Sequence, residues 1–172
     1  KSADAIFVGG ALGNTFLHQR GSNVGKSKIE DEKIPKEILW SPKILLPDDA
    51  IVLRGGKKKT VVMNEIKKGD IVYDAGPKTV AALSVFVSSA KFVLWNGTLG
   101  FCEKGFDFGT RELCKALGKS KAYKVVGGGD TVAAIRKFKA EKNFDFISTG
   151  GGAMLEFLAT GTLPGIEALK RE

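Results

Sequence analysis

The sequence gathers its glycines into short clusters that stand between apolar runs and helical patterns. Clusters at residues 9–10, 127–129 and 150–152 each stand directly or shortly after an apolar run, and a fourth lies at 55–56. The 22 glycines among 172 residues exceed the usual share of roughly 7%, but they are not periodic, which argues against a fibrous fold. Clustered glycine marks places where the backbone turns tightly or approaches another group closely. The chain is therefore expected to repeat one unit: strand, glycine turn, helix.

The apolar pattern predicts strands and helices in alternation. Strands are expected at residues 5–8, 43–46, 51–53, 60–64, 71–73, 92–95, 124–126 and 144–148. Helices are expected at 12–19, 29–40, 77–89, 109–117, 131–140 and 153–159, with prolines suited to a helix start at 35 and 77. This alternation indicates an α/β fold: a three-layer, Rossmann-like parallel sheet flanked by helices. Residues 43–72 fit less clearly and predict a small antiparallel addition.

One domain spanning residues 1–172 is expected from the length and from the hydrophobic content of 43%. In parallel sheets the ligand crevice lies beyond the carboxyl ends of the strands. The turns at 9–10, 96–97, 127–129 and 150–152 all follow predicted strands. We therefore expect these four turns to converge on one edge of the sheet.

The charge balance favours acidic partners. The formal net charge is +8 and the isoelectric point is about 9.5, which suits nucleic acid, an anionic membrane or phosphorylated metabolites, or simply a solvated basic face. The basic residues are scattered, except for a lysine run at 57–59 that predicts an exposed hairpin-like loop. Aromatic residues do not interleave with that run, so a surface that stacks nucleic-acid bases is poorly supported.

Cysteine and histidine are too few for metal or disulfide chemistry. The chain has Cys102, Cys114 and His18, and its cysteines form no C-x-x-C pair, so zinc binding and thioredoxin-type chemistry are not expected. The missing disulfide framework fits a reducing, cytoplasmic location. The sequence has no run of 18 apolar residues, so no membrane association is expected.

The strongest candidate for chemistry is the turn at 127–131, which joins a predicted strand to a predicted helix. Its glycine amides and the helix start suit a phosphate, Asp130 can hold a magnesium ion, and Thr131 can donate a hydroxyl to the same phosphate. The alternative is an ordinary helix cap with a tight turn. A second junction of this kind at 148–152 favours phosphate binding, since both helix starts would face one crevice.

Two nucleotide-binding patterns fail to match. None of the glycine turns satisfies the dinucleotide fingerprint G-x-G-x-x-G, which weakens a dehydrogenase interpretation. Residues 21–27 resemble a phosphate-binding P-loop but are one residue short and follow a helix rather than a strand. We interpret this segment as unrelated to phosphate. A dinucleotide oxidoreductase and a nucleic-acid-binding module remain the alternatives, and NADH binding or steeply salt-dependent DNA binding would support them.

A third turn closes the predicted strand at 92–95. Residues 95–100 form a glycine-flanked loop, and Glu103 lies just beyond it. Such a loop could seat a base, and the carboxylate could bind ribose hydroxyls; the alternative is a surface loop with a solvated glutamate.

Seven ordered motifs give the chain a specific resemblance. They stand at residues 7–17, 25–27, 74–79, 95–103, 127–131, 148–153 and 163–169. In this order they resemble the nucleotide-binding, C-terminal domain of phosphoglycerate kinases, across essentially the whole chain. The family transfers a phosphoryl group reversibly between 1,3-bisphosphoglycerate and Mg-ADP, giving 3-phosphoglycerate and Mg-ATP in glycolysis.

The resemblance implies a base site and a ribose site. Gly9, Gly10 and Gly76 would flank the adenine, and Leu99 and Phe101 would pack on it. Glu103 would hold the ribose. Two departures touch this side: Thr98 stands where the family usually has proline, and Cys102 where it usually has an aromatic residue.

The resemblance also implies a phosphate site. Asn96 would contact phosphate, Asp130 would bind magnesium, and Thr131 would bind the transferred or terminal phosphate. Charge on the phosphoryl group would be stabilised by the amides of Gly128, Gly129, Gly151 and Gly152. Phosphoryl transfer depends mainly on such positioning and charge stabilisation.

The family's other domain, which carries a basic patch for phosphoglycerate and a catalytic arginine, has no counterpart in these 172 residues. A lysine-bearing segment is also expected just before Lys1. We therefore expect a monomeric nucleotide-binding half that binds ATP or ADP with magnesium, meets 3-phosphoglycerate only through the other domain, and does not catalyse alone.

Overall fold

The computed structural model describes residues 3–170. Within it the chain forms two compact units. Unit 1 contains the residues up to Phe86 together with Thr98–Leu113, and unit 2 contains Val87–Gly97 together with the residues from Cys114 onward.

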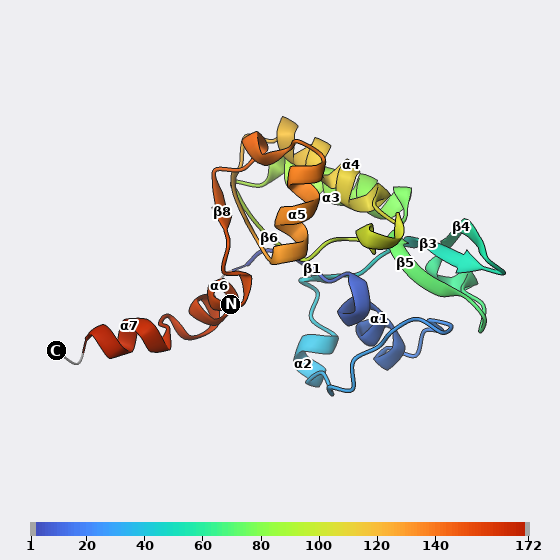
Figure 1. Ribbon diagram of the computed structural model, residues 1–172. Coiled ribbons are helices and arrows are strands. Elements are labelled where there is room, and N and C mark those ends of the chain that lie inside the picture. Colours follow the sequence, from blue (N-terminus) through green and yellow to red (C-terminus); the bar gives the residue numbers. More distant parts are fainter. Residues whose placement is uncertain (1–2, 171–172) are drawn as a thin grey trace. The chain divides into compact units, whose positions relative to one another are not determined.

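Unit 1 holds two small sheets (Figure 1). Strand β1 (Ile6–Phe7) pairs in parallel with β2 (Ile44–Leu45), while β3 (Asp49–Arg54) pairs antiparallel with both β4 (Lys57–Val62) and β5 (Ile71–Ala75). The other elements that begin in this unit are α1 (Gly10–Gln19), α2 (Lys36–Leu39), η1 (Met63–Glu65), α3 (Pro77–Ser89), η2 (Cys102–Lys104) and α4 (Phe108–Lys119). The antiparallel addition expected within residues 43–72 is thus confirmed.

The β3–β4 hairpin corrects the expectation for the lysine run. Gly55 and Gly56 take φ values of +56° and +75°, which suits a two-residue turn that needs positive φ at both central positions. Because the two glycines complete the turn, residues 57–59 belong to strand β4 rather than to a loop, and their side chains are exposed there. The strand expected at 60–64 likewise ends at Val62.

The helix expected at 29–40 was wrong over most of its length, because only Lys36–Leu39 is helical. Pro35 has φ −54° and ψ 140°, an extended conformation that leads into the short helix. A proline cannot donate a backbone hydrogen bond to a preceding turn, and it disfavours helical geometry in the residue before it. The apolar spacing in this segment therefore reflects packing: Leu39 is buried against Val8 and Phe16.

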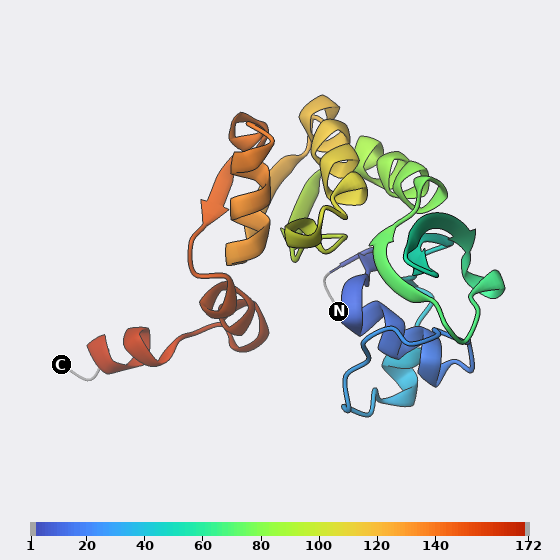
Figure 2. The same ribbon diagram turned by 45° about the vertical axis from the view of Figure 1, so that its right-hand side comes forward.

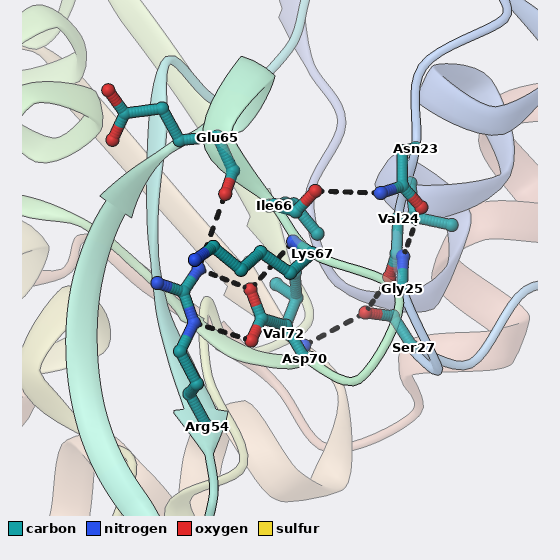
Figure 3. Close-up of polar contacts among 10 residues, drawn as sticks. All are labelled: Asn23, Val24, Gly25, Ser27, Arg54, Glu65, Ile66, Lys67, Asp70 and Val72. Atoms are coloured by element: carbon teal, nitrogen blue, oxygen red, sulfur yellow. Dashed lines mark hydrogen bonds and ion pairs between the residues drawn. The ribbon is translucent and has the colours of Figure 1, made fainter.

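A partly buried ion pair joins β3 to the turn before β5 (Figure 3). Arg54 donates two hydrogen bonds to Asp70, at 2.7 Å from Nε and 2.6 Å from Nη2, and the Lys67 amide donates a third at 2.9 Å. These donors hold the pKa of the Asp70 carboxyl at about 2, below its ordinary value near 4. The pair therefore stabilises the fold above about pH 4, and this contribution is lost as the pH falls towards 2.

Unit 2 contains a parallel sheet of three strands in the order β6 (Phe92–Asn96), β7 (Tyr123–Gly127) and β8 (Phe146–Ser148). Helix α5 (Gly129–Lys137) lies against this sheet in both views (Figures 1 and 2). Val126 and Ile135 are fully buried between them. The remaining elements are η3 (Glu141–Asn143), α6 (Gly151–Thr160) and α7 (Pro164–Leu169). Helix α7 was not predicted, although Pro164 at its first position is a helix-start signal.

The two faces of this sheet differ. Trp95 and Val126 are buried, whereas Phe92, Tyr123 and Phe146 are each more than half exposed. Phe92 and Tyr123 are cross-strand neighbours and stack with ring centroids 6.1 Å apart. The fold class is confirmed: a parallel sheet flanked by helices, with a small antiparallel sheet in addition.

Candidate functional site

Three of the four predicted turns follow neighbouring strands of one sheet. The β6–β7–β8 register sets Asn96 opposite Gly127, and Gly127 opposite Ser148. The carboxyl ends of the three strands are therefore level with one another. The fourth turn, at Gly9 and Gly10, follows β1, which pairs with β2 in a different sheet.

The turn after β7 requires glycine at its centre. Gly128 takes φ +92° as the residue that caps α5. A Cβ atom on Gly128 would lie 3.2 Å from both Asn96 Oδ1 and Thr131 Oγ1. Because α5 begins at Gly129, the amides of its first turn, which have no partners within the helix, belong to the glycine turn itself. That arrangement presents backbone donors and the positive end of the helix dipole to an anion.

The turn after β8 lies directly on the turn after β7. A Cβ atom on Gly151 would be 2.5 Å from the Gly128 amide nitrogen, 2.6 Å from Gly128 Cα and 3.4 Å from Asn96 Nδ2. Helix α6 begins at Gly151, so a second set of first-turn amides starts at this contact. The structure thus brings together Asn96, Gly128 and Gly151, and it places Gly129 and Gly152 next to them in the chain.

Thr131 ties two turns to each other. Its side chain is fully buried, and its hydroxyl oxygen accepts a hydrogen bond from the Gly97 amide at 2.9 Å. Gly97 itself takes φ +91°. The hydroxyl group can still donate a hydrogen bond, but a contact between Thr131 and a phosphate stays a prediction. The sequence predicted a turn at residues 96–97, but it did not predict that the Gly97 amide would bind Thr131.

Asp130 is suited to a metal that arrives with its ligand. The side chain is exposed in the first turn of α5, beside the two glycine turns. In the described part of the chain, no three His, Cys, Asp or Glu side chains gather in a group that could hold a metal ion. Magnesium is commonly held by one or two carboxylates together with substrate phosphates rather than by an all-protein cage. One exposed carboxylate beside the backbone amides of two helix starts fits that mode.

The residues expected at the base and ribose lie in unit 1. Leu99 is buried, whereas Phe101 is 41% exposed and Glu103 is exposed on η2. The loop is fixed by its neighbours: the Phe101 amide donates to the Tyr73 carbonyl at 2.9 Å, and the Leu99 amide donates to Thr110 Oγ1 at 3.0 Å. Thr110, buried at the start of α4, was not among the predicted site residues.

Cys102 lies in the same loop, and its thiol is not activated. Burial raises the pKa of this thiol above its ordinary value, and the nearby carboxylates Asp74, Asp107 and Glu103 act in the same direction. A thiol that resists ionisation is a poor nucleophile. These surroundings therefore do not favour a reactive role for Cys102.

The remaining predicted residues have separate surroundings in unit 1. Gly9 caps α1, and Gly10 begins that helix with φ +61°. Gly76 is buried, and a Cβ atom there would lie 2.5 Å from both carboxylate oxygens of Asp49. Asp49 in turn accepts hydrogen bonds from the amides of Lys78 and Thr79 in the first turn of α3. The glycine at 76 is therefore needed for a helix cap, and its contact with adenine stays a prediction.

Unit 1 also has an open cavity of about 550 Å³. It is lined by Pro47, Asp48, Val62, Met63, Asn64 and Lys78. None of these residues was predicted to contact nucleotide. No helix among residues 3–170 combines the length and the apolar character needed to cross a membrane.

Comparisons with known proteins place these features in a family. A family model described as phosphoglycerate kinase matches residues 1–161. A phosphoglycerate kinase of Solibacter usitatus is 43% identical over 178 residues, which cover 99% of this chain and 46% of that protein.

Solved structures agree with the family model. The structure of phosphoglycerate kinase from Coxiella burnetii superposes with a TM-score of 0.88 at 36% identity, covering 98% of this chain and 46% of that one. The crystal structure of phosphoglycerate kinase from Pyrococcus horikoshii OT3 gives a TM-score of 0.80 at 28% identity, covering 98% and 45%. The chain spans about half the length of these relatives, and it belongs to the phosphoglycerate kinase family.

Proposed function

We propose that the chain is the nucleotide-binding domain, residues 1–172, of a phosphoglycerate kinase. The whole enzyme would transfer a phosphoryl group reversibly between 1,3-bisphosphoglycerate and Mg-ADP, as a glycolytic phosphotransferase. The observation that supports this most strongly is the contact between Gly151 and Gly128 beside Asn96, because it joins two helix starts at one edge of a parallel sheet. Family membership supports the identity of the substrates.

Each part of the cradle has a proposed role. Asn96 contacts phosphate, and the amides of Gly128, Gly129, Gly151 and Gly152 stabilise charge on the phosphoryl group. Asp130 holds magnesium, which would offset the negative charge of the phosphates when bound. The Thr131 hydroxyl donates a hydrogen bond to the terminal phosphate. Preorganised donors of this kind lower the cost of charge that develops during transfer.

The base and ribose are assigned to unit 1. Leu99 and Phe101 would pack on the adenine between Gly9, Gly10 and Gly76, and Glu103 would accept hydrogen bonds from the ribose hydroxyls. The partial exposure of Phe101 supports this role, because exposed aromatic surface can be covered by a base. We further propose a monomeric, cytoplasmic protein that meets 3-phosphoglycerate through the remaining part of a full-length kinase.

Binding of Mg-ADP and Mg-ATP to the 172-residue chain tests the proposal. Calorimetry is expected to show saturable binding, and Asp130→Ala is expected to weaken binding in magnesium while leaving the magnesium-free affinity nearly unchanged. Loss of one charge-assisted metal contact predicts an effect of about tenfold. Asp145→Ala serves as the control, because Asp145 immediately precedes β8, at the opposite end of that strand from the glycine turn, and its carboxylate contacts Lys124 instead. The absence of binding at millimolar nucleotide would refute the proposal.

Catalysis by this chain alone is expected to be negligible. The chain spans 46% of its relatives, and the described residues offer a nucleotide cradle without an assigned phosphoglycerate site. A coupled assay that follows phosphoglycerate-dependent consumption of ATP should therefore stay at background for the purified chain. Robust phosphoglycerate-dependent turnover would contradict this expectation without touching the nucleotide-binding result.

A further inference from the structure

Asp74 is a buried carboxyl group that the proposed function leaves without a role. It stands near the end of β5, and only 2% of its surface is exposed. Its two oxygens accept hydrogen bonds from the amides of Ala75 at 2.8 Å and Gly109 at 3.1 Å. Gly109 lies in the first turn of α4, so Asp74 caps that helix from a strand far away in the sequence.

The carboxyl group leaves no room for a side chain at two neighbouring glycines. A Cβ atom on Gly109 would lie 2.6 Å from Asp74 Oδ1, and a Cβ atom on Gly100 would overlap the carboxyl carbon itself. Gly100 is the central residue of the loop that carries Leu99 and Phe101. The carboxyl group therefore lies in direct contact with the backbone of that loop, between the loop and the start of α4.

The backbone of β5 holds the loop on both sides of Gly100. The Ala75 amide donates to the Leu99 carbonyl at 3.3 Å, and the Phe101 amide donates to the Tyr73 carbonyl at 2.9 Å. Asp74 stands between these two strand residues. Any shift of its carboxyl group must therefore move Gly100 or α4, because the space around it is filled by backbone.

We propose that Asp74 is a positioning residue for nucleotide binding, and that its carboxylate fixes the Leu99–Phe101 loop against the start of α4. This inference rests on the proposed assignment of Leu99 and Phe101 to the base. The charged form does the positioning, since a carboxylate accepts the amide hydrogen bonds at the positive end of α4. Protonation removes that charge and loosens the loop.

The charge state of Asp74 changes in an accessible pH range. Burial raises the pKa of the Asp74 carboxyl to about 6, against the opposing effect of the amide donors, and the Asp107 carboxylate raises it further. Asp107, which precedes α4, and the Cys102 thiol of η2 are the titratable groups that interact with it. A carboxyl group with a raised pKa lowers fold stability as the pH rises from about 4 to 6. Positioning and stability therefore respond to pH in opposite directions.

Calorimetric titration of Mg-ADP into the 172-residue chain between pH 5 and 7.5 tests the proposal. The Kd of the unaltered chain should rise about fivefold from pH 7.5 to 5, and Asp74→Asn should bind about fivefold more weakly at pH 7.5 with little further change on acidification. Protonation of the nucleotide itself affects both proteins equally, so the ratio of the Kd of Asp74→Asn to that of the unaltered chain at each pH cancels this contribution. A merely structural role would make the Kd follow thermal stability, whereas here stability should increase as binding weakens on acidification.

A second variant tests the idea with Asp74 in place. Asp107→Asn removes a repulsive charge, so the midpoint of the pH profile should move to lower pH while the affinity at pH 7.5 is retained. The inference is overturned if Asp74→Asn binds like the unaltered chain at pH 7.5, or if Asp107→Asn leaves the midpoint in place. If the unaltered chain fails to bind Mg-ADP at every pH, the proposed function fails as well; binding without these differences removes the role of Asp74 alone.

Discussion

Replacing Gly25 with alanine is expected to destabilise unit 1 by about 3–5 kcal/mol. Gly25 takes φ +65°, and a Cβ atom there would overlap the Asp70 carbonyl oxygen and lie 2.8 Å from the Lys67 carbonyl oxygen. Both obstacles are backbone atoms in the turn that holds the Arg54–Asp70 ion pair (Figure 3). Urea unfolding followed by circular dichroism measures the loss, which is large beside a typical domain stability of 5–15 kcal/mol.

Gly21→Ala is the matched control for this prediction. Gly21 also takes a positive φ, of +89°, but a Cβ atom there would meet nothing within 4 Å. Alanine at 21 should therefore cost only the backbone strain, about 1 kcal/mol. Equal losses of stability in the two variants would show that the 67–70 turn can shift to make room for the methyl group. That result would contradict the close packing assigned to Gly25.

The same segment explains why residues 21–27 resemble a P-loop without serving as one. The Lys26 amide donates to the Asp70 carbonyl at 2.7 Å, and Ser27 Oγ accepts from the Val72 amide at 2.8 Å. Asn23 bonds to the Ile66 carbonyl at 2.7 Å. The small and polar residues that suggest phosphate binding are used to join this loop to the approach to β5. In the sequence, the missing residue and the position after a helix had already indicated that this segment is not a P-loop.

Local signals predicted elements better than they predicted sheets. The strand–glycine–helix units after β7 and β8 were predictable because each apolar run led into a glycine cluster, and a helix begins within that cluster. The pairing of β1 with β2, apart from β6–β7–β8, was not predictable, because pairing depends on contacts that no local pattern encodes. The lysines of β4 were assigned to a loop for a similar reason. Their place in the sheet depends on pairing with residues of β3 on the other side of the turn, and the lysine run itself does not encode that pairing.

The candidate site was likewise predictable from the sequence in some parts and not in others. The turns at 127–131 and 150–152 were predicted from residue type, and their mutual contact through Gly151 and Gly128 agrees with that prediction. The roles of Thr110 and Asp74 could not be predicted, because the hydrogen-bond partner of each lies in a different segment of the chain. Thr110 of α4 accepts from the Leu99 amide, and Asp74 of β5 accepts from the Gly109 amide. Gly76 shows the reverse difficulty, since its contact with Asp49 already requires glycine, whether or not a ligand binds there.

Gly151→Ala is expected to weaken Mg-ADP binding by at least about tenfold. The added methyl group would have to occupy the position 2.5 Å from the Gly128 amide nitrogen and 2.6 Å from its Cα. Because both neighbours are backbone, the two glycine turns must separate, and the amides at the starts of α5 and α6 would no longer face one ligand. Calorimetry of the variant beside the unaltered chain measures the loss, and thermal unfolding shows how much of it reflects a disturbed fold.

Gly165→Ala provides the comparison within the same unit, because Gly165 lies in α7 and a Cβ atom there would meet nothing within 4 Å. Alanine is the better helix former, so this variant should keep its Kd and gain slightly in Tm. A Gly151→Ala protein that bound Mg-ADP normally would show that phosphate does not depend on the two turns meeting. If both variants lost affinity equally, the loss would come from helix ends in general, and the contact between Gly151 and Gly128 would not be what assembles the cradle.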